Sequence, residues 1–449
     1  MGKPHKELNL VLFLLGLFSM TQIRIIGAIG ISEIPIFIIA PFMFLKDYRT
    51  LKVDGFLPII WLSLLTCGGN CIASYMNETH IVYAIKGFAT PYSIFAVVVV
   101  LHRLLRDNLM GYKWLLIGIA FSLIVNIFVF QQDAELSAFA DGAVGIEAGR
   151  RIAQTSAIFW TSRIRPFVEL PMSAWYTQVP LGVSVMLIIF FVVFSAVTTA
   201  SGRGFAATAM ASVVLLMVGR KKRKHMQFFK QHFGLFVVGC CAVSIILTTV
   251  YKAAAQSGLM GEQSRDKYER QMEDRKGVLG LLQGGRGEVF IGLTACVDKP
   301  IFGYGPCPID KNDYVKRYYE KYGTSRQWNE FISYDDYLSS IGRARCYVIP
   351  AHSHLISFWL YYGIIGLVLW VYVLYLIVIY FKRYVDVVPQ WFGYMAVTLP
   401  TFVWSIAFSP YGYRVATPLT ICLLLFSRAI SRGMIRPSFE MIKEEAKYN

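Results

Sequence analysis

The chain alternates between long hydrophobic runs and short polar segments. A helix needs about 20 apolar residues to cross a bilayer, and eleven runs come close to that length. They lie near residues 8–28, 31–46, 56–74, 82–101, 112–130, 179–199, 202–219, 233–251, 356–381, 391–408 and 414–430. The pattern therefore predicts an all-α polytopic membrane protein.

Basic residues between the runs predict which ends face the cytoplasm, because short cytoplasmic loops carry an excess of Lys and Arg. The densest cluster extends from Arg220 to His225, and others lie at 46–49, 102–113 and 428–432. With these segments inside, the long segment 252–350 becomes one large periplasmic loop. The expected domains are an N-terminal membrane region at 1–251, the loop at 252–350, a C-terminal membrane region at 351–432 and a cytoplasmic tail at 433–449.

Counting crossings from the two ends of the chain leaves one crossing unassigned. It falls between residues 150 and 178, where Arg163, Arg165 and Pro171 interrupt an otherwise apolar stretch. Such a segment is tolerated at membrane depth where protein or a water-filled cavity shields it. We expect a broken helix lining a polar cavity, which gives about 12 transmembrane helices. A re-entrant hairpin, with eleven spans, is the alternative.

Composition agrees with a membrane protein and narrows the class further. Of 449 residues, 55% are hydrophobic and 16% are charged, against about 25% charged in ordinary soluble domains. Mean hydropathy is +0.50. The net charge of +16 is spread between hydrophobic runs, so it indicates membrane topology rather than nucleic-acid binding. Basic groups in the large loop are available to an anionic substrate.

The cysteines show no zinc-ligand spacing. Three of the eight, Cys296, Cys307 and Cys346, fall in the large loop. A periplasmic location leaves room for one disulfide among them, with one cysteine left over.

Three segments bring candidate chemistry to the predicted outer side. The first is Ser201–Gly204, where Arg203 is the only long side chain. In the second, the run 288–297 predicts a short amphipathic helix with Arg286 at its N-terminal end. A turn rich in Pro and Gly follows it at 300–306 and includes Tyr304.

The third segment, Ala351–Leu355, contains two histidines at the start of an apolar helix. His352 and His354 are two residues apart, so at most one of them faces a given site. Ser353 between them can donate and accept a hydrogen bond. Neither a carboxylate nor a cysteine nearby completes a metal-ligand set, so we expect no metal.

In this order, the three segments resemble the bacterial O-antigen ligase and O-antigen polymerase family of membrane glycosyltransferases. Members share a large periplasmic loop between late helices and an Arg at a Ser-Arg-Gly turn. They also share an Arg-led loop helix that ends in a Pro-(Leu/Ile)-x-Gly-x-Gly turn. A His-Asn-x-x-Leu helix start followed by Gly-x-x-Gly completes the pattern. The matches here are Arg203, Arg286 with 300–305, and His352 with Gly363 and Gly366. The chain departs from the pattern at Ser-Gly-Arg and at Ser353 in place of Asn.

The resemblance implies a metal-independent, inverting transfer that uses no cofactor. The donor would be a glycan on undecaprenyl pyrophosphate, with Arg203 and Arg286 on the pyrophosphate. His352 would be the general base on an acceptor hydroxyl, although His354 could be the functional ring instead. Supporting roles would fall to Ser353, His354, Arg163, Arg165 and Tyr304.

The acceptor would be a growing glycan for a polymerase or a lipid A-core for a ligase, and a polymerase would work with a chain-length regulator protein. The Tyr-rich stretch 314–347 offers aromatic faces for several sugars and slightly favours polymerase. Membrane lipids are expected partners and nucleic acid is not. The location expected is the bacterial inner membrane, with the active site facing the periplasm. A transporter or flippase for lipid-linked glycans is the alternative function.

Overall fold

The computed structural model describes residues 6–19, 21–24, 28–108, 111–128, 277–322, 348–384 and 389–409, with isolated positions between 170 and 257 and between 411 and 427. Most of these residues are helical, in agreement with the predicted all-α class. The predicted spans at 179–199, 202–219, 233–251 and 414–430 lie outside the continuous described segments, as do the segment 150–178, the basic cluster at 220–225 and the tail at 433–449.

The first hydrophobic run does not form one helix, so the predicted span at 8–28 is wrong. Helix α1 (Lys6–Leu17) ends at Leu17 and is followed by a small antiparallel hairpin of β1 (Gln22–Arg24) and β2 (Ala28–Gly30). The residues after Leu17 include β-branched and polar side chains that favour strands over helix. Twelve residues span only about 18 Å, less than the hydrocarbon core of a bilayer.

Helix α1 packs against α5 (Tyr112–Phe128) through two glycines. A Cβ added at Gly16 or at Gly118 would overlap the backbone of the other helix. Small residues therefore let these two backbones approach closely, as is common between membrane helices. The Asn108 side chain, just before α5, donates to Asn9 at 2.6 Å, so both helices start at the same end of the molecule.

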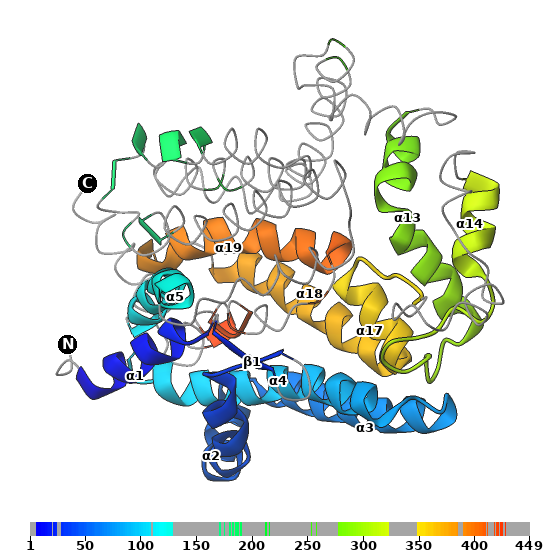
Figure 1. Cartoon of the computed structure of the whole chain (residues 1–449). Coiled ribbons are helices and arrows are strands. Elements are labelled where there is room, and N and C mark those ends of the chain that lie inside the picture. Colours follow the sequence, from blue (N-terminus) through cyan, green and yellow to red (C-terminus); the bar gives the residue numbers. More distant parts are fainter. Residues whose placement is uncertain are drawn as a thin grey trace.

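Helices α2 (Glu33–Val53), α3 (Leu57–Met76) and α4 (Ile81–Leu105) form one bundle. We call these and the apolar helices at 112–128 and 354–408 membrane-type, a name that refers to their apolar composition alone. In Figure 1, α3 and α4 lie side by side, and α4 packs against both other helices. Both α3 and α4 are long and apolar enough to cross a membrane, and shorter apolar segments lie at Tyr112–Ser122, Ile364–Ile379 and Gly393–Phe408. The total of twelve spans stays a prediction.

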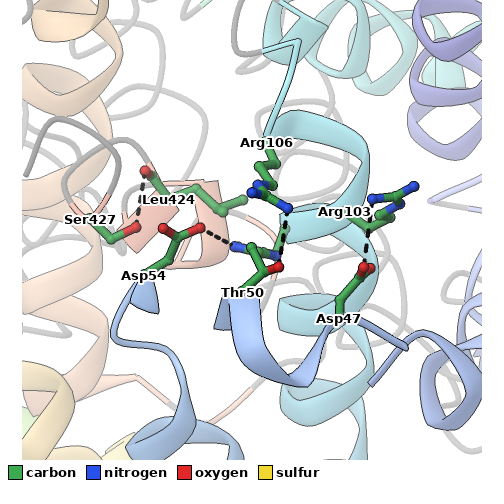
Figure 2. Close-up of polar contacts among 8 residues, drawn as sticks. Asp47, Thr50, Asp54, Arg103, Arg106, Leu424 and Ser427 are labelled. Atoms are coloured by element: carbon green, nitrogen blue, oxygen red, sulfur yellow. Dashed lines mark hydrogen bonds and ion pairs between the residues drawn. The ribbon is translucent and has the colours of Figure 1, made fainter. Parts of the chain in front are cut away.

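Two of the predicted inside segments meet at one end of this bundle. Arg103 Nη1 lies 3.5 Å from Asp47 Oδ1, and buried His102 Nε2 lies 2.7 Å from Asp54 Oδ2 (Figure 2). Helix α2 continues to Val53, past the predicted end of the span at residue 46, and buries Asp47 within its last turns. The carboxyl groups of Asp47 and Asp54 are tolerated there because each has a basic side chain beside it.

The C-terminal run forms α17 (His354–Tyr362), α18 (Ile364–Tyr384) and α19 (Pro389–Phe408). The predicted single span at 356–381 is interrupted at Gly363. Helices α17 and α18 pack against α3, and α17 also contacts α19. Figure 1 shows α18 and α17 above the α3–α4 pair, inclined to it and approaching it at the end of α3.

The large loop contributes α13 (Gly277–Asp298) and α14 (Tyr314–Tyr322). They share a separate core with residues 349–360, distinct from the core of the membrane-type helices. The short helix predicted at 288–297 begins eleven residues earlier than expected, because Gly284, Gly285 and Gly287 do not break it. The charged run at 262–276 and residues 323–347 lie outside the described residues.

Candidate functional site

The second and third sequence motifs, sixty residues apart, meet in space. The backbone N–H of Tyr304 donates to the carbonyl of Leu360 at 2.7 Å, and that of Gly305 donates to Tyr361 at 3.1 Å. In the other direction, the N–H of Ile364 donates to the carbonyl of Ile301 at 3.1 Å. The Pro- and Gly-rich turn therefore serves as the C-terminal cap of α17 and satisfies carbonyls that a helix end leaves unpaired.

Glycine is required at this junction for two reasons. Gly363 has φ +69° and Gly303 also has φ +69°, a region that other residues rarely adopt. A Cβ at Gly363 would also overlap the carbonyl of Ile301. The close approach explains physically why glycines stand at both positions of the motif.

Helix α13 lies against the segment that leads into α17. A Cβ built on Gly292 would be 3.0 Å from the Pro350 carbonyl and 3.2 Å from the Ala351 Cβ. The segment is held from its other side by the N–H of Ile349, which donates to Pro308 at 2.8 Å. Glu288 lies one turn before Gly292 on the same face of α13, which brings it beside His352.

Nδ1 of the His352 imidazole lies in direct contact with the Oε2 carboxylate oxygen of Glu288. The side chains are 41% and 42% exposed, so both remain accessible to a ligand. A carboxylate bound to one ring nitrogen fixes the tautomer and leaves Nε2 as the free base. The sequence includes Glu288 in the predicted helix at 288–297 but gives it no role, because nothing in the sequence places it opposite His352.

His354 and Ser353 point into the protein instead. His354 is 1% exposed, and its ring lies 5.1 Å from that of Trp370 and 5.4 Å from that of Tyr411, measured between centroids. The Ser353 hydroxyl donates to the carbonyl of Ile406 at 2.8 Å and accepts the N–H of Ile356 at 3.3 Å. Ser353 is therefore the N-cap of α17 and ties it to α19, while His354 packs in an aromatic cluster.

Tyr304 holds the loop domain together rather than facing His352. Its hydroxyl lies 2.7 Å from that of Tyr314, which in turn donates to Asp298. Burial, followed by the bond to Tyr314, raises the pKa of the Tyr304 hydroxyl well above its ordinary value. Tyr314 and Tyr318 face the same core, so these two rings are not free for sugars and do not support the argument for a polymerase.

The structure does not describe the side chains of the four arginines that the sequence predicts at the site. Arg203, Arg163 and Arg165 lie outside the described residues, and for Arg286 only the helical backbone is described. Position 286 is in the middle of α13, not at its start. It lies about 200° around the helix from position 288 at 100° per residue, so the two positions face different sides. Convergence of the arginines with His352 stays a prediction.

Cys296 is buried against the Ile356 carbonyl as a free thiol. Burial raises its pKa to about 12, so the thiol stays protonated at neutral pH. The predicted disulfide therefore does not involve Cys296. Cys346 lies outside the described residues.

Among the described side chains, no group of three His, Cys, Asp or Glu residues is arranged to hold a metal ion. What the described site offers is an accessible acid–imidazole pair, a geometry suited to removing a proton from a hydroxyl.

Comparison with known proteins finds no matching protein-family model and no similar curated protein. The chemistry of this chain has to be inferred from its own residues.

Proposed function

We propose that the chain is a multi-pass protein of the bacterial inner membrane that transfers a glycan from undecaprenyl pyrophosphate to a sugar hydroxyl on the periplasmic side. The observation that carries the proposal is the Glu288–His352 pair. The pair joins the motif predicted in the periplasmic loop to the motif predicted at the outer end of a hydrophobic run. A transporter needs no such accessible pair outside its helices, so the pair favours an enzyme.

In the proposed reaction, Nε2 of His352 takes the proton of the acceptor hydroxyl. The oxygen then attacks the anomeric carbon of the donor, and the bond from that carbon to the pyrophosphate oxygen breaks. Undecaprenyl pyrophosphate leaves with the electron pair, and attack from the opposite face inverts the anomeric centre. Glu288 keeps His352 in the required tautomer and stabilises the imidazolium that forms.

The departing pyrophosphate needs fixed positive charge. Arg203 and Arg286 are the proposed ligands, because guanidinium groups bind phosphate oxygens through two parallel hydrogen bonds and keep their charge. Replacing either residue by Lys preserves the charge and loses this geometry, so activity should fall. The two acceptors, growing glycan and lipid A-core, remain alternatives within this function.

The test is transfer by the purified chain in proteoliposomes supplied with lipid-linked donor and a glycan acceptor. We expect His352→Ala to lower turnover by roughly 100-fold or more, the usual contribution of a general base. Glu288→Gln should lower kcat in the same direction, with little change in donor binding. Glu288→Asp should recover part of the rate, because the carboxylate is retained.

Two control variants test whether a loss of turnover comes from the chemistry at His352 and Glu288 or from a general change in charge or stability. His80→Ala removes an exposed imidazole at the N-cap of α4, and Glu320→Gln removes an exposed carboxylate on α14. Both should retain near-normal turnover. If His352→Ala keeps that turnover in a folded preparation, the catalytic role assigned to His352 is wrong.

A further inference from the structure

Helix α13 exposes a row of large apolar side chains although the sequence assigns it to an extramembrane loop. Leu293 is 39% exposed and Val297 63% exposed, whereas Ile291 and Ala295 on the opposite side are buried. The row continues past the helix end to Ile301, which is 59% exposed. Positions four residues apart share one helix face, so Leu293 and Val297 form a stripe. We name Leu293, Val297, Ile301 and Phe302 the α13 stripe.

The α13 stripe meets a second apolar row on a membrane-type helix. On α18 the exposed side chains recur at helical spacing, at Ile364, Val368, Val371, Tyr375 and Val378. The hydrogen bond from Ile364 to Ile301 places the start of that row beside the end of the α13 stripe. The apolar row of α18 therefore begins beside the end of the α13 stripe, and between Val297 and Ile301 the polar residues Asp298 and Lys299 are also exposed.

Polar contacts fix the depth of this junction. Lys299 donates to the side chain of Asn77 at 2.7 Å, and Asn77 is the C-cap of α3, a helix long enough to span a membrane. The indole N–H of Trp359 donates to the Pro300 carbonyl at 3.0 Å. Lys and Trp side chains are typical of the boundary between bilayer and water. These contacts favour a position of the junction at the bilayer surface, at the end of α3.

The orientation of α13 suits contact along the bilayer surface. Figure 1 shows α13 at one end of α3 and α4 and running crosswise to them. A helix crosswise to spanning helices lies roughly parallel to the membrane plane. Beside the stripe, the hydroxyl of Thr294 donates to its own helix at the Phe290 carbonyl (3.0 Å), so that hydroxyl is already paired.

We propose that the α13 stripe is inserted among the acyl chains of the outer leaflet, so that α13 is an interfacial helix. The occupant of this surface is phospholipid, and the helix holds the Glu288–His352 pair at headgroup depth. The inference requires the chain to be embedded in a membrane, but it does not require glycan transfer. Continuity with the α18 row and the junction at the end of α3 both favour lipid over a second protein chain.

The test is photo-crosslinking of the full chain, one copy per nanodisc, in a phosphatidylcholine and phosphatidylglycerol bilayer. Single variants Val297→p-benzoylphenylalanine and Ile301→p-benzoylphenylalanine probe the stripe. The same substitution at Val371 is the reference for the α18 row, and at Arg317, exposed on α14, it is the aqueous control. Intact mass spectrometry then measures the phospholipid adduct after irradiation.

We expect adducts at 297 and 301 to match that at 371 and to exceed that at 317 several-fold. Adducts at 371 but not at 297 or 301 would overturn the interfacial helix alone and leave the membrane enzyme intact. Absence of adducts at all four positions would overturn both membrane embedding and this inference. A covalent dimer formed through position 297 at higher copy number, with no lipid adduct, would identify a second chain as the occupant and also overturn it.

Discussion

Replacing Gly363 by Ala should destabilise the junction between the loop and the membrane-type helices. The new Cβ would overlap the Ile301 carbonyl, and Ala would have to adopt φ +69°. Holding a non-glycine residue in such a conformation costs about 1–3 kcal/mol. Displacing the turn breaks the hydrogen bond from Ile364 to Ile301, which contributes about 1 kcal/mol. We expect a total loss of about 3 kcal/mol.

The chain offers a matched control for this substitution. A Cβ added at Gly68, within α3, would meet nothing within 4 Å. Because Ala is the better helix former, Gly68→Ala should be neutral or stabilising by up to about 1 kcal/mol. The pair therefore compares the same chemical change at a strained site and at an open one.

The assay is thermal unfolding of the detergent-solubilised chain, followed by tryptophan fluorescence at a fixed scan rate. We expect the apparent Tm of Gly363→Ala to fall by roughly 5 °C and that of Gly68→Ala to stay the same or rise. Gly363→Ala should also lose transfer activity at temperatures where it remains folded, because the turn positions α13 and with it Glu288. Equal melting temperatures for Gly363→Ala and the parent chain would show that the junction does not have this geometry.

Two further outcomes follow from the same region. Ser353→Ala removes the N-cap of α17 and the bond to Ile406, so it should lower stability by about 2 kcal/mol. Thr294→Ala, whose hydroxyl bonds only its own helix, should leave the melting temperature unchanged. The pKa of the Tyr304 hydroxyl is raised in the folded chain, so Tyr304 stabilises the fold fully below pH of about 10, the ordinary tyrosine pKa. Above that pH the tyrosine ionises first in the unfolded chain, which lowers the free energy of unfolding. Melting temperatures should thus fall between pH of about 10 and 11, and less steeply in Tyr304→Phe; parallel curves for the two proteins would contradict this.

Hydrophobic pattern was sufficient for the helices whose limits coincide with changes in polarity. α3, α4, α5 and α19 were predicted within a few residues, because each run is flanked by charged or turn residues. The pattern failed at Gly363, where the chain stays apolar while its backbone changes direction, and after Leu17, where polar and β-branched residues end the helix inside an otherwise hydrophobic run. Apolar content shows burial or membrane contact, but it does not reveal a break satisfied by a distant segment.

The candidate site was predictable only in part for a similar reason. That His352 and His354 face different ways follows from their spacing, and the structure confirms it. That Glu288 lies beside His352 depends on the close approach of α13 at Gly292, a contact between segments sixty residues apart. No local sequence pattern encodes a contact between segments so far apart in the chain. The roles assigned to Arg203 and Arg286 stay predictions.

The way α17 ends determines whether the large loop can be exchanged as an independent unit. Its last carbonyls, at Leu360 and Tyr361, are satisfied by backbone N–H groups of the loop turn at 304–305. A chimera that exchanges only the loop would leave a membrane-type helix with an uncapped end, and an excised loop would expose the face that docks there. Grafts intended to change substrate choice should therefore exchange residues 277–322 together with 348–366 as one unit. Evolution faces the same constraint, so changes in the turn and in the helix break should be inherited together.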